Sequence, residues 1–130
     1  MHAQPYAGAL EAVERILNRE SEADEVLRQT VEVVHDRIDT YAWVGLSFVE
    51  DGDSVLGPSK GADEGRPRLE TPVVYGGMHV ATLLVETRAP LTEQDTSFLE
   101  RITVLISAHC LVGWDTGGVP WESPGAEAGT

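Results

Sequence analysis

The first part of the chain carries apolar side chains at helical spacing, which predicts two amphipathic helices. In residues 8–20 the apolar stripe consists of Leu10, Val13, Ile16 and Leu17. In residues 21–38 it consists of Val26, Leu27, Val31, Val34 and Ile38. Ser21 precedes Asp24 by three residues, a capping-box pattern with Asp in place of the usual Glu, so we expect the second helix to begin there. His35 lies beside the stripe and is expected at the surface.

The period then changes from helical to alternating, which predicts two β-hairpins. Residues 41–50, YAWVGLSFVE, are rich in aromatic and β-branched side chains, and a turn at Asp51-Gly52 leads into a short strand that ends at Gly57-Pro58. Residues 58–69 carry Gly, Pro and charge and are expected to form a loop. The segments LETPVVY and MHVATLLVET flank Gly76-Gly77, a strong hairpin turn because glycine accepts positive φ.

The last periodic segment predicts a long helix. Thr92 and Asp95 form another N-cap pattern at its start. Its apolar stripe consists of Phe98, Leu99, Ile102, Leu105 and Ile106. We expect the helix to end near Val112, with Gly113 as the C′ cap and Trp114 folded back as an aromatic anchor. Residues 1–118 then form a single domain, and residues 119–130, rich in Gly, Pro and Ala, form a disordered tail.

The order α-α-β-β-β-β-α predicts an α+β fold, with the helices packed on one face of an antiparallel sheet of about four strands. Side chains alternate between the two faces of a strand. The helix-covered face should receive Ala42, Val44, Leu46, Phe48, Ala81, Leu83 and Val85. The opposite face should receive Tyr41, Trp43, Gly45, Ser47, Val49, Thr82, Leu84 and Glu86.

Composition narrows the partners. The chain has 22 acidic and 9 basic residues and a net charge of −13, which repels nucleic-acid phosphates and anionic membranes, so we expect neither as a partner. The acidic balance fits either a GC-rich genome with an acidic surface or a salty cytoplasm. No apolar run approaches the ~18 residues of a spanning helix, and no basic region precedes the first apolar residues as in a signal peptide. A single cysteine, Cys110, fits a cytoplasmic location.

Three stretches together resemble the GAF domain family over residues 8–108. They are DEVLRQTVEVVHDRIDTYAWVGLSFVEDGDSVLGPSKG, TPVVYGGMHVATLLVET and PLTEQDTSFLERITVLIS. Within that family, YAWVGLSFVE followed by VLGPSKG is most similar to the free methionine-(R)-sulfoxide reductase branch, which carries similar WVG-x-Y and LGP-x-x-G strands. The resemblance implies a GAF-like fold that holds small molecules on the sheet face opposite the helices, under a capping segment.

The chain departs from that branch where the chemistry needs thiols. The reductases carry cysteines after the LGP-x-x-G strand, where this chain has ADEGRPRLE. Reduction of a sulfoxide by thiols needs a thiolate that attacks sulfur, and Cys110 on the final helix matches none of those positions. The capping segment of several tens of residues is also missing. We therefore expect no catalytic residues and no cofactor.

Comparison with the branch selects the candidate ligand-binding residues. Trp43 matches the aromatic residue of the WVG strand, and Ser47 matches its Tyr. Leu84 and Glu86 match two substrate-facing Asp residues of the last strand, so one acid is lost and one is kept. The candidate set on this face is Trp43, Ser47, Thr82, Leu84 and Glu86.

With the cap shortened, three coverings of this face stay open. The loop 58–69 or the tail could fold over it, a second subunit could cover it, or it could be a shallow pocket for a small, partly apolar ligand with Glu86 as the polar anchor. The corresponding functions are a non-catalytic GAF-like module for small-molecule sensing or regulation, a homodimerisation or protein-interaction module without ligand, and, third, a reductase-like enzyme.

Other motifs predict no site. Asp115-Thr116-Gly117 matches the triplet of aspartic proteases, but the residues before it have helical period, so we interpret it as a turn after a helix. His109 and Cys110 point about 100° apart on that helix and predict no metal site. His79 is expected to be an exposed strand residue.

Overall fold

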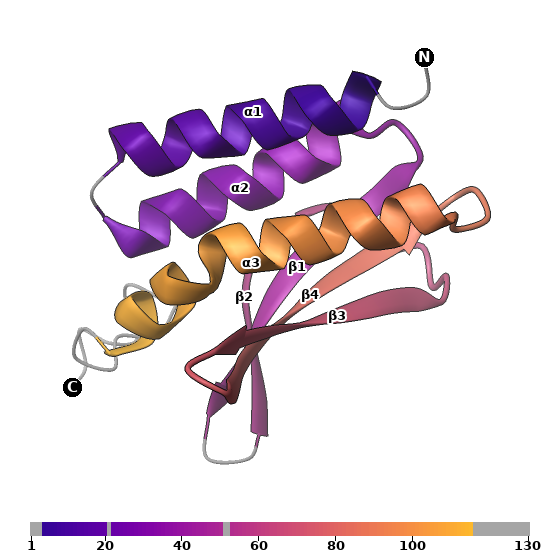
Figure 1. Ribbon diagram of the computed structural model, residues 1–130. Helices are drawn as coiled ribbons and strands as arrows, with labels where there is room; N and C mark the ends of the chain where they lie inside the picture. The colour runs from indigo at the N-terminus through magenta and orange to yellow at the C-terminus, as the bar shows by residue number, and fades with distance from the viewer. Residues whose placement is uncertain (1–3, 21, 51–52, 116–130) are drawn as a thin grey trace.

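The computed structural model describes residues 4–20, 22–50 and 53–115 (Figure 1). The elements are α1 (Gln4–Arg19), α2 (Ala23–Arg37), β1 (Tyr41–Glu50), β2 (Asp53–Gly61), β3 (Arg68–Tyr75), β4 (Met78–Thr87) and α3 (Glu93–Asp115). The predicted α+β order is confirmed. The expected tail at residues 119–130 lies outside the described residues.

The four strands form one antiparallel sheet in the order β2-β1-β4-β3. One face is covered by two helices, α2 on β1 and β2, and α3 on β3 and β4 (Figure 1). Helix α1 packs against α2 and α3 rather than against the sheet. We call the sheet face opposite α2 and α3 the outer face, and none of the helices in the described ranges covers it.

The core lies between the sheet and the helices, where the apolar periods place it. The strand residues assigned to the helix-covered face are all buried. So are most residues of the helical stripes, whereas Leu10, Leu17 and Leu105 are partly buried at the margin. The buried side chains of this core from the strands are Ala42, Val44, Leu46, Phe48, Ala81, Leu83 and Val85.

Strand β2 is longer than predicted, and the loop after it is shorter. The strand continues through Gly57 and Pro58 to Gly61, so the loop spans residues 62–67 instead of 58–69. The reason is a bulge between Gly45 and Ser47 of β1, at which Gly57 and Pro58 together oppose one residue. Proline lacks an N–H donor and is tolerated at a bulge of an edge strand, which β2 is.

The predicted position of Tyr41 on the outer face is wrong, because a second bulge interrupts β1 beside it. Tyr41 opposes Thr87 while Trp43 opposes Glu86, so the alternation of faces breaks between Tyr41 and Trp43. Tyr41 therefore turns into the core, where it is 1% exposed, instead of lying on the outer face as the strict period of two predicts.

Of the predicted ends of α3, the start agrees with the sequence and the end does not, whereas the predicted cap of α2 at Ser21 lies outside the described residues. At α3 the predicted reciprocal cap is present, because Thr92 N donates to Asp95 Oδ2 (2.9 Å) and Asp95 N donates to Thr92 Oγ1 (3.2 Å). The N-cap of α2 is Glu22, whose side chain makes no capping bond within the described residues, while Ser21 lies outside them. The predicted end of α3 near Val112 is wrong. The helix runs through Gly113 to Asp115, since an interior glycine costs only about 1 kcal/mol relative to alanine.

Candidate functional site

The strand register brings the candidate residues together on the outer face. Trp43 of β1 opposes Glu86 of β4, and the next pairs along the same two strands are Gly45 with Leu84 and Ser47 with Thr82. Residues directly opposite one another on antiparallel strands have Cβ atoms about 5 Å apart, so the set forms one contiguous patch. Their role in binding a ligand stays a prediction.

The Trp43 ring lies along the sheet over Gly45. A Cβ atom built at Gly45 would come within 2.4 Å of Trp43 Cη2 and 2.7 Å of Cζ2, so the ring occupies the space that a side chain there would need. In this position Trp43 is only 6% exposed. The indole is therefore packed against the sheet at Gly45 and has little contact with solvent.

Glu86 carries a carboxylate that is completely buried. It is 0% exposed, and its oxygens accept hydrogen bonds from the Glu64 backbone N (3.1 Å to Oε1) and from Arg68 Nε (3.1 Å to Oε2). A buried charge is tolerated only when it is paired and hydrogen-bonded, and these two donors meet that requirement. Arg68 opens β3 and directly opposes Glu86 in the β3–β4 pair.

The same guanidinium lies over the Trp43 ring. Arg68 Cζ is 4.0 Å from the ring centroid, a cation–π distance. Trp43, Glu86 and Arg68 therefore form one cluster, which we call the Trp–Glu–Arg cluster. It consists of an aromatic face, a buried carboxylate and a planar cation that contacts both.

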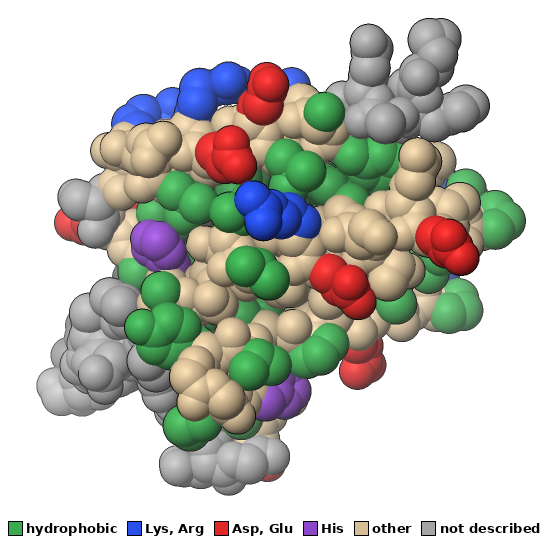
Figure 2. Space-filling model, in the orientation of Figure 1, with side chains coloured by type: hydrophobic (Ala, Val, Ile, Leu, Met, Phe, Trp, Pro, Cys, Tyr) green, Lys and Arg blue, Asp and Glu red, His purple; other side chains and the backbone are tan. Residues whose placement is uncertain are grey.

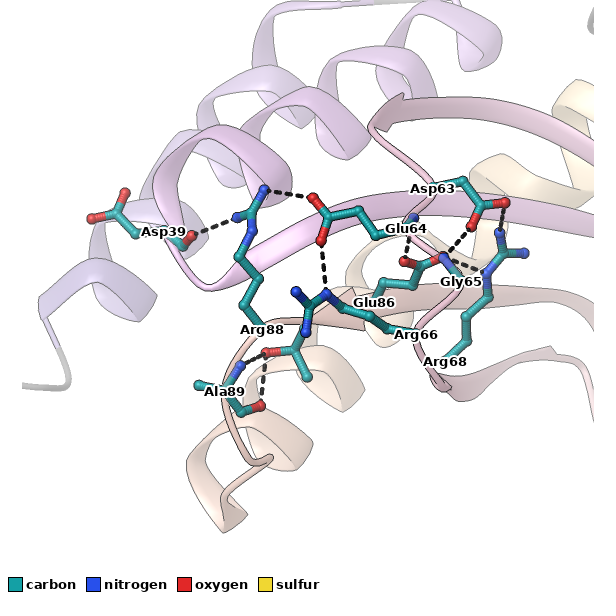
Figure 3. A network of polar contacts seen from close by, with 10 residues as sticks. Asp39, Asp63, Glu64, Gly65, Arg66, Arg68, Glu86, Arg88 and Ala89 are labelled. Atoms are coloured by element: carbon teal, nitrogen blue, oxygen red, sulfur yellow. Dashed lines mark hydrogen bonds and ion pairs between the residues drawn. The ribbon is translucent and has the colours of Figure 1, made fainter.

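The loop 62–67 is tied over this cluster by a network of charged side chains (Figure 3). Asp63 accepts from the Gly65 backbone N (3.0 Å) and from Arg68 Nη2 (2.9 Å), and the Gly65 bond is the largest cause that lowers the pKa of Asp63. Glu64 pairs with Arg66 (2.7 Å) and Arg88 (3.4 Å), and the Arg66 bond is the largest cause that lowers its pKa. The first of the three expected coverings is thus present at this end of the outer face, built by a shorter loop than predicted.

The rest of the outer face is apolar and partly open. Thr82 and Leu84 are half-buried and Ser47 is 8% exposed, while Leu56, which opposes Ser47 from β2, is 46% exposed. His79 is exposed, as predicted, and its Nε2 lies 2.9 Å from Thr82 Oγ1. This part of the face offers small polar groups among aliphatic side chains.

The other residues singled out from the sequence lie away from the cluster. His35 is half-buried instead of fully at the surface, and its Nδ1 is 2.8 Å from Asp36 Oδ1. Cys110 is buried, and burial raises the pKa of its thiol to about 12, which keeps it protonated and unreactive. Burial lowers the pKa of His109. Among the described residues no group of three or more His, Cys, Asp or Glu could hold a metal ion, and no described helix is long and apolar enough to cross a membrane.

A shallow groove of about 380 Å³ lies between α1 and α3. Its lining includes the apolar and aromatic residues Tyr6, Leu10 and Phe98 and the charged residues Glu93 and Arg101. Figure 2 shows hydrophobic side chains between these helices, among interspersed acidic and basic ones. The groove lacks what the outer face has, a fully buried charge beside an aromatic ring, so its chemistry is less specific.

Comparison with known proteins shows the fold. No family model and no curated protein matches the sequence, whereas solved structures match most of the chain. The GAF domain of a phosphoenolpyruvate-protein phosphotransferase from Coxiella burnetii has a TM-score of 0.74 at 11% identity and covers 92% of this chain and 100% of that chain. The corresponding GAF domain from Acinetobacter has a TM-score of 0.65 at 15% identity, over 85% and 96%.

A reductase structure is equally similar. Free methionine-R-sulfoxide reductase from Neisseria meningitidis, in complex with its substrate, has a TM-score of 0.72 at 15% identity and covers 87% of this chain and 92% of that chain. Because all of these identities are low, the likeness carries the fold and leaves the activity open. The expected fold is therefore confirmed: the chain has a GAF-like fold and lies structurally near both the GAF domains of phosphoenolpyruvate-protein phosphotransferases and a free methionine-R-sulfoxide reductase.

Proposed function

We propose that this chain is a non-catalytic, GAF-like regulatory module of the cytoplasm that responds to a small molecule bound on the outer face of its sheet. The observation that carries the proposal is the Trp–Glu–Arg cluster, in which a buried carboxylate and an aromatic face converge on one cation. Burying a charge on a strand costs desolvation free energy, and an apolar pair at the same positions would stabilise the fold at least as well. The presence of the buried carboxylate therefore favours a binding role.

The neighbouring residues supply what a small-molecule site needs beyond a charged anchor. Ligand sites are mostly apolar with a few polar groups that set orientation. Leu84 offers aliphatic surface next to Trp43, and Thr82 and Ser47 offer hydroxyl groups on the same face. A non-catalytic role is supported by Cys110, because a thiol whose pKa is about 12 does not provide the thiolate that sulfoxide reduction requires.

A thermal-shift screen against a panel of metabolites tests this function. A ligand present at 100 times its Kd stabilises the native state by about 2.7 kcal/mol, which is easily measured. We expect at least one compound to raise the melting temperature of the wild-type chain and not that of Trp43→Ala. Glu93→Gln, an exposed change on α3 away from the outer face, is the matched control and should respond like the wild type. A panel that shifts neither protein, or both equally, would contradict the proposal.

A second candidate function is that of a homodimerisation or interaction module. It is favoured by three large apolar side chains, Val74 (53% exposed), Tyr75 (41%) and Met78 (66%), at the turn between β3 and β4. Exposed apolar groups gathered at one place often mark a protein contact. Light scattering over a range of concentrations should then show a dimer that Met78→Asp dissociates, and a monomer at every concentration would exclude the homodimer.

A further inference from the structure

We propose that Arg68 is an intramolecular ligand. Its guanidinium occupies a cation site formed by Trp43 and Glu86, and a free guanidinium compound enters that site only when Arg68 leaves it. The inference rests on the small-molecule site proposed above. It assigns guanidinium compounds as the ligand class of that site, and the state with Arg68 bound as its closed state.

The two halves of the site belong to the rigid part of the sheet, whereas the occupant comes from its edge. Trp43 and Glu86 lie on β1 and β4, the two central strands, which are paired on both sides. Arg68 is the first residue of β3, an edge strand, and follows directly on the loop 62–67. The binding groups are therefore fixed by strand pairing on both sides, and the group that fills the site is attached where the backbone is held from one side only.

The contacts of Arg68 select a guanidinium over other cations. Its Nε donates to Glu86 Oε2 at 3.1 Å while its Cζ lies 4.0 Å from the Trp43 ring centroid, so one planar group contacts a carboxylate acceptor and an aromatic ring together. A guanidinium combines in-plane donors with two stacking faces, whereas an ammonium is a compact, strongly hydrated point charge. The carboxylate, 0% exposed, has its Oε2 satisfied by this donor, so a competitor must restore the same bond.

The bonds that hold Arg68 and its loop in place are mostly exposed. The side chains of Asp63, Arg66 and Arg88 are 59%, 42% and 46% exposed, and ion pairs of that exposure contribute little to stability because solvent screens them. Opening the site therefore costs chiefly the buried contacts of Arg68 itself. A free guanidinium compound replaces those contacts, although it competes with a tethered group whose effective concentration is on the order of millimolar.

Ligand entry would be coupled to the loop. When Arg68 leaves Glu86 it also leaves Asp63, to which its Nη2 is bonded at 2.9 Å, so the ion pair between β3 and the loop is lost (Figure 3). The exchange of an internal for an external guanidinium thus changes the surface presented by residues 62–67, which provides a regulatory output without any chemical step.

Removing the internal ligand tests the inference. Arg68→Ala deletes the side chain beyond Cβ, and ethylguanidinium is the fragment that has been deleted. We expect calorimetry and tryptophan fluorescence to show saturable binding of ethylguanidinium to Arg68→Ala at low millimolar concentration, and none to the wild type over the same range. Arg66→Ala is the matched control, because it removes another arginine of the network that contacts Glu64 and leaves the Trp–Glu–Arg cluster intact. It should behave like the wild type.

Three further arms make the result decisive. Arg68→Ala combined with Glu86→Gln should lose the binding, and ethylammonium should bind Arg68→Ala at least tenfold more weakly than ethylguanidinium. If Arg68→Ala is too unstable for calorimetry, ethylguanidinium should raise its melting temperature more than the same concentration of sodium chloride does. Absence of both binding and rescue in Arg68→Ala overturns the inference, as does equal binding by the wild type, or equal binding of ethylammonium.

The inference and the proposed function can fail separately. Binding of ethylguanidinium to Arg68→Ala alone, with no response of the wild type to the metabolite panel, supports the internal ligand and refutes sensing by the wild-type chain. A wild-type response to a metabolite that Trp43→Ala abolishes, with no binding of ethylguanidinium to Arg68→Ala, supports sensing and refutes the internal ligand.

Discussion

A single glycine determines where the Trp43 ring can lie. Gly45 is the next residue of β1 on the outer face, and the ring occupies the space that a methyl group at this position would need. The position of the ring in turn sets the distance to Arg68. The glycine, which the sequence shows only as an interruption of a β-rich run, is thus part of the candidate site.

Gly45→Ala is expected to displace the ring and weaken the cluster. A methyl group 2.4 Å from Trp43 Cη2 must push the indole away, and overpacking of this kind costs about 1–3 kcal/mol of the free energy of unfolding. Urea unfolding measures the cost. Repeating the change in a Trp43→Ala background completes a double-mutant cycle. The cost should vanish there, and an unchanged cost would show that the ring is not the obstacle.

Charged residues of the site were the hardest to predict at this scale. Glu86 matches a family position, whereas the sequence pattern places Arg68 and Glu64 in a loop and does not connect either of them with Glu86. The register projected back from the Gly76-Gly77 turn places Arg68 opposite Val85, on the wrong face. A bulge between Val73 and Val74 shifts that register by one residue and brings Arg68 opposite Glu86.

At the scale of elements, Asp95 joins three parts of the fold. Its Oδ1 accepts from Tyr6 of α1 (2.8 Å) and Tyr41 of β1 (2.7 Å), and its Oδ2 accepts from Thr92 N and Oγ1 at the start of α3. Burial alone would raise the pKa of this carboxyl, but the bonds from Tyr41, Thr92 and Tyr6 outweigh it and the pKa is lowered. Burial and the bond to Asp95 raise the pKa of both tyrosines.

The lowered pKa of Asp95 predicts an acid-sensitive contribution to stability. A carboxyl with a depressed native pKa stabilises the fold fully above its unfolded value, 3.8, and loses that contribution as the pH falls through the native value. We therefore expect the stability gap between the wild type and Asp95→Asn to be large at neutral pH and to narrow below about pH 4. Denaturant unfolding at a series of pH values measures the gap.

The control for this prediction is Glu93→Gln, which removes an exposed charge from the same helical turn. Because Glu93 is exposed, its gap to the wild type should be small at every pH. A gap for Asp95→Asn that stays constant down to pH 2 would show that the Asp95 bonds do not depend on its charge.

The elements show where sequence patterns succeed and fail. Helical and alternating periods predicted every element in order, because burial of an apolar stripe is what defines each one. The same periods placed Tyr41 and the end of β2 wrongly, because a bulge inserts a residue without leaving a signature in the apolar pattern. Of the network around Asp95, the sequence indicates only the capping motif with Thr92. The bond from Tyr6 leaves no local pattern, because Tyr6 is 89 residues away in the chain.

For the whole molecule, most basic side chains are paired with carboxylates, while many carboxylates have no basic residue to balance them. Within the part of the chain that the structure describes, six of the nine basic residues form ion pairs, namely Arg19, Arg28, Lys60, Arg66, Arg68 and Arg88. The 22 acidic residues far outnumber them, so the surface carries a large excess of carboxylates. Such an excess keeps a protein soluble but destabilises the compact state through repulsion between like charges.

This balance predicts that moderate salt stabilises the fold. Added sodium chloride screens repulsion among exposed carboxylates, since the Debye length falls to about 10 Å at 0.1 M, and it also weakens the exposed ion pairs. Exposed ion pairs contribute little to stability, so repulsion at a net charge of −13 should dominate. The buried Arg68–Glu86 pair is screened least, because the Glu86 side chain is 0% exposed. Relief of about 1 kcal/mol would raise the melting temperature by about 4 °C.

A variant with fewer exposed carboxylates provides the control for the salt prediction. Replacing the exposed Glu11 and Glu14 of α1 by Gln removes two negative charges without touching the sheet. This double variant should melt at a higher temperature than the wild type in low salt, and the two should converge as salt is added, because the repulsion that it removes is the repulsion that salt screens. If the wild type instead melts at a lower temperature as salt rises, the ion pairs, with the loop 62–67 network foremost, outweigh the repulsion, and the loop holds Arg68 more firmly than its exposure implies.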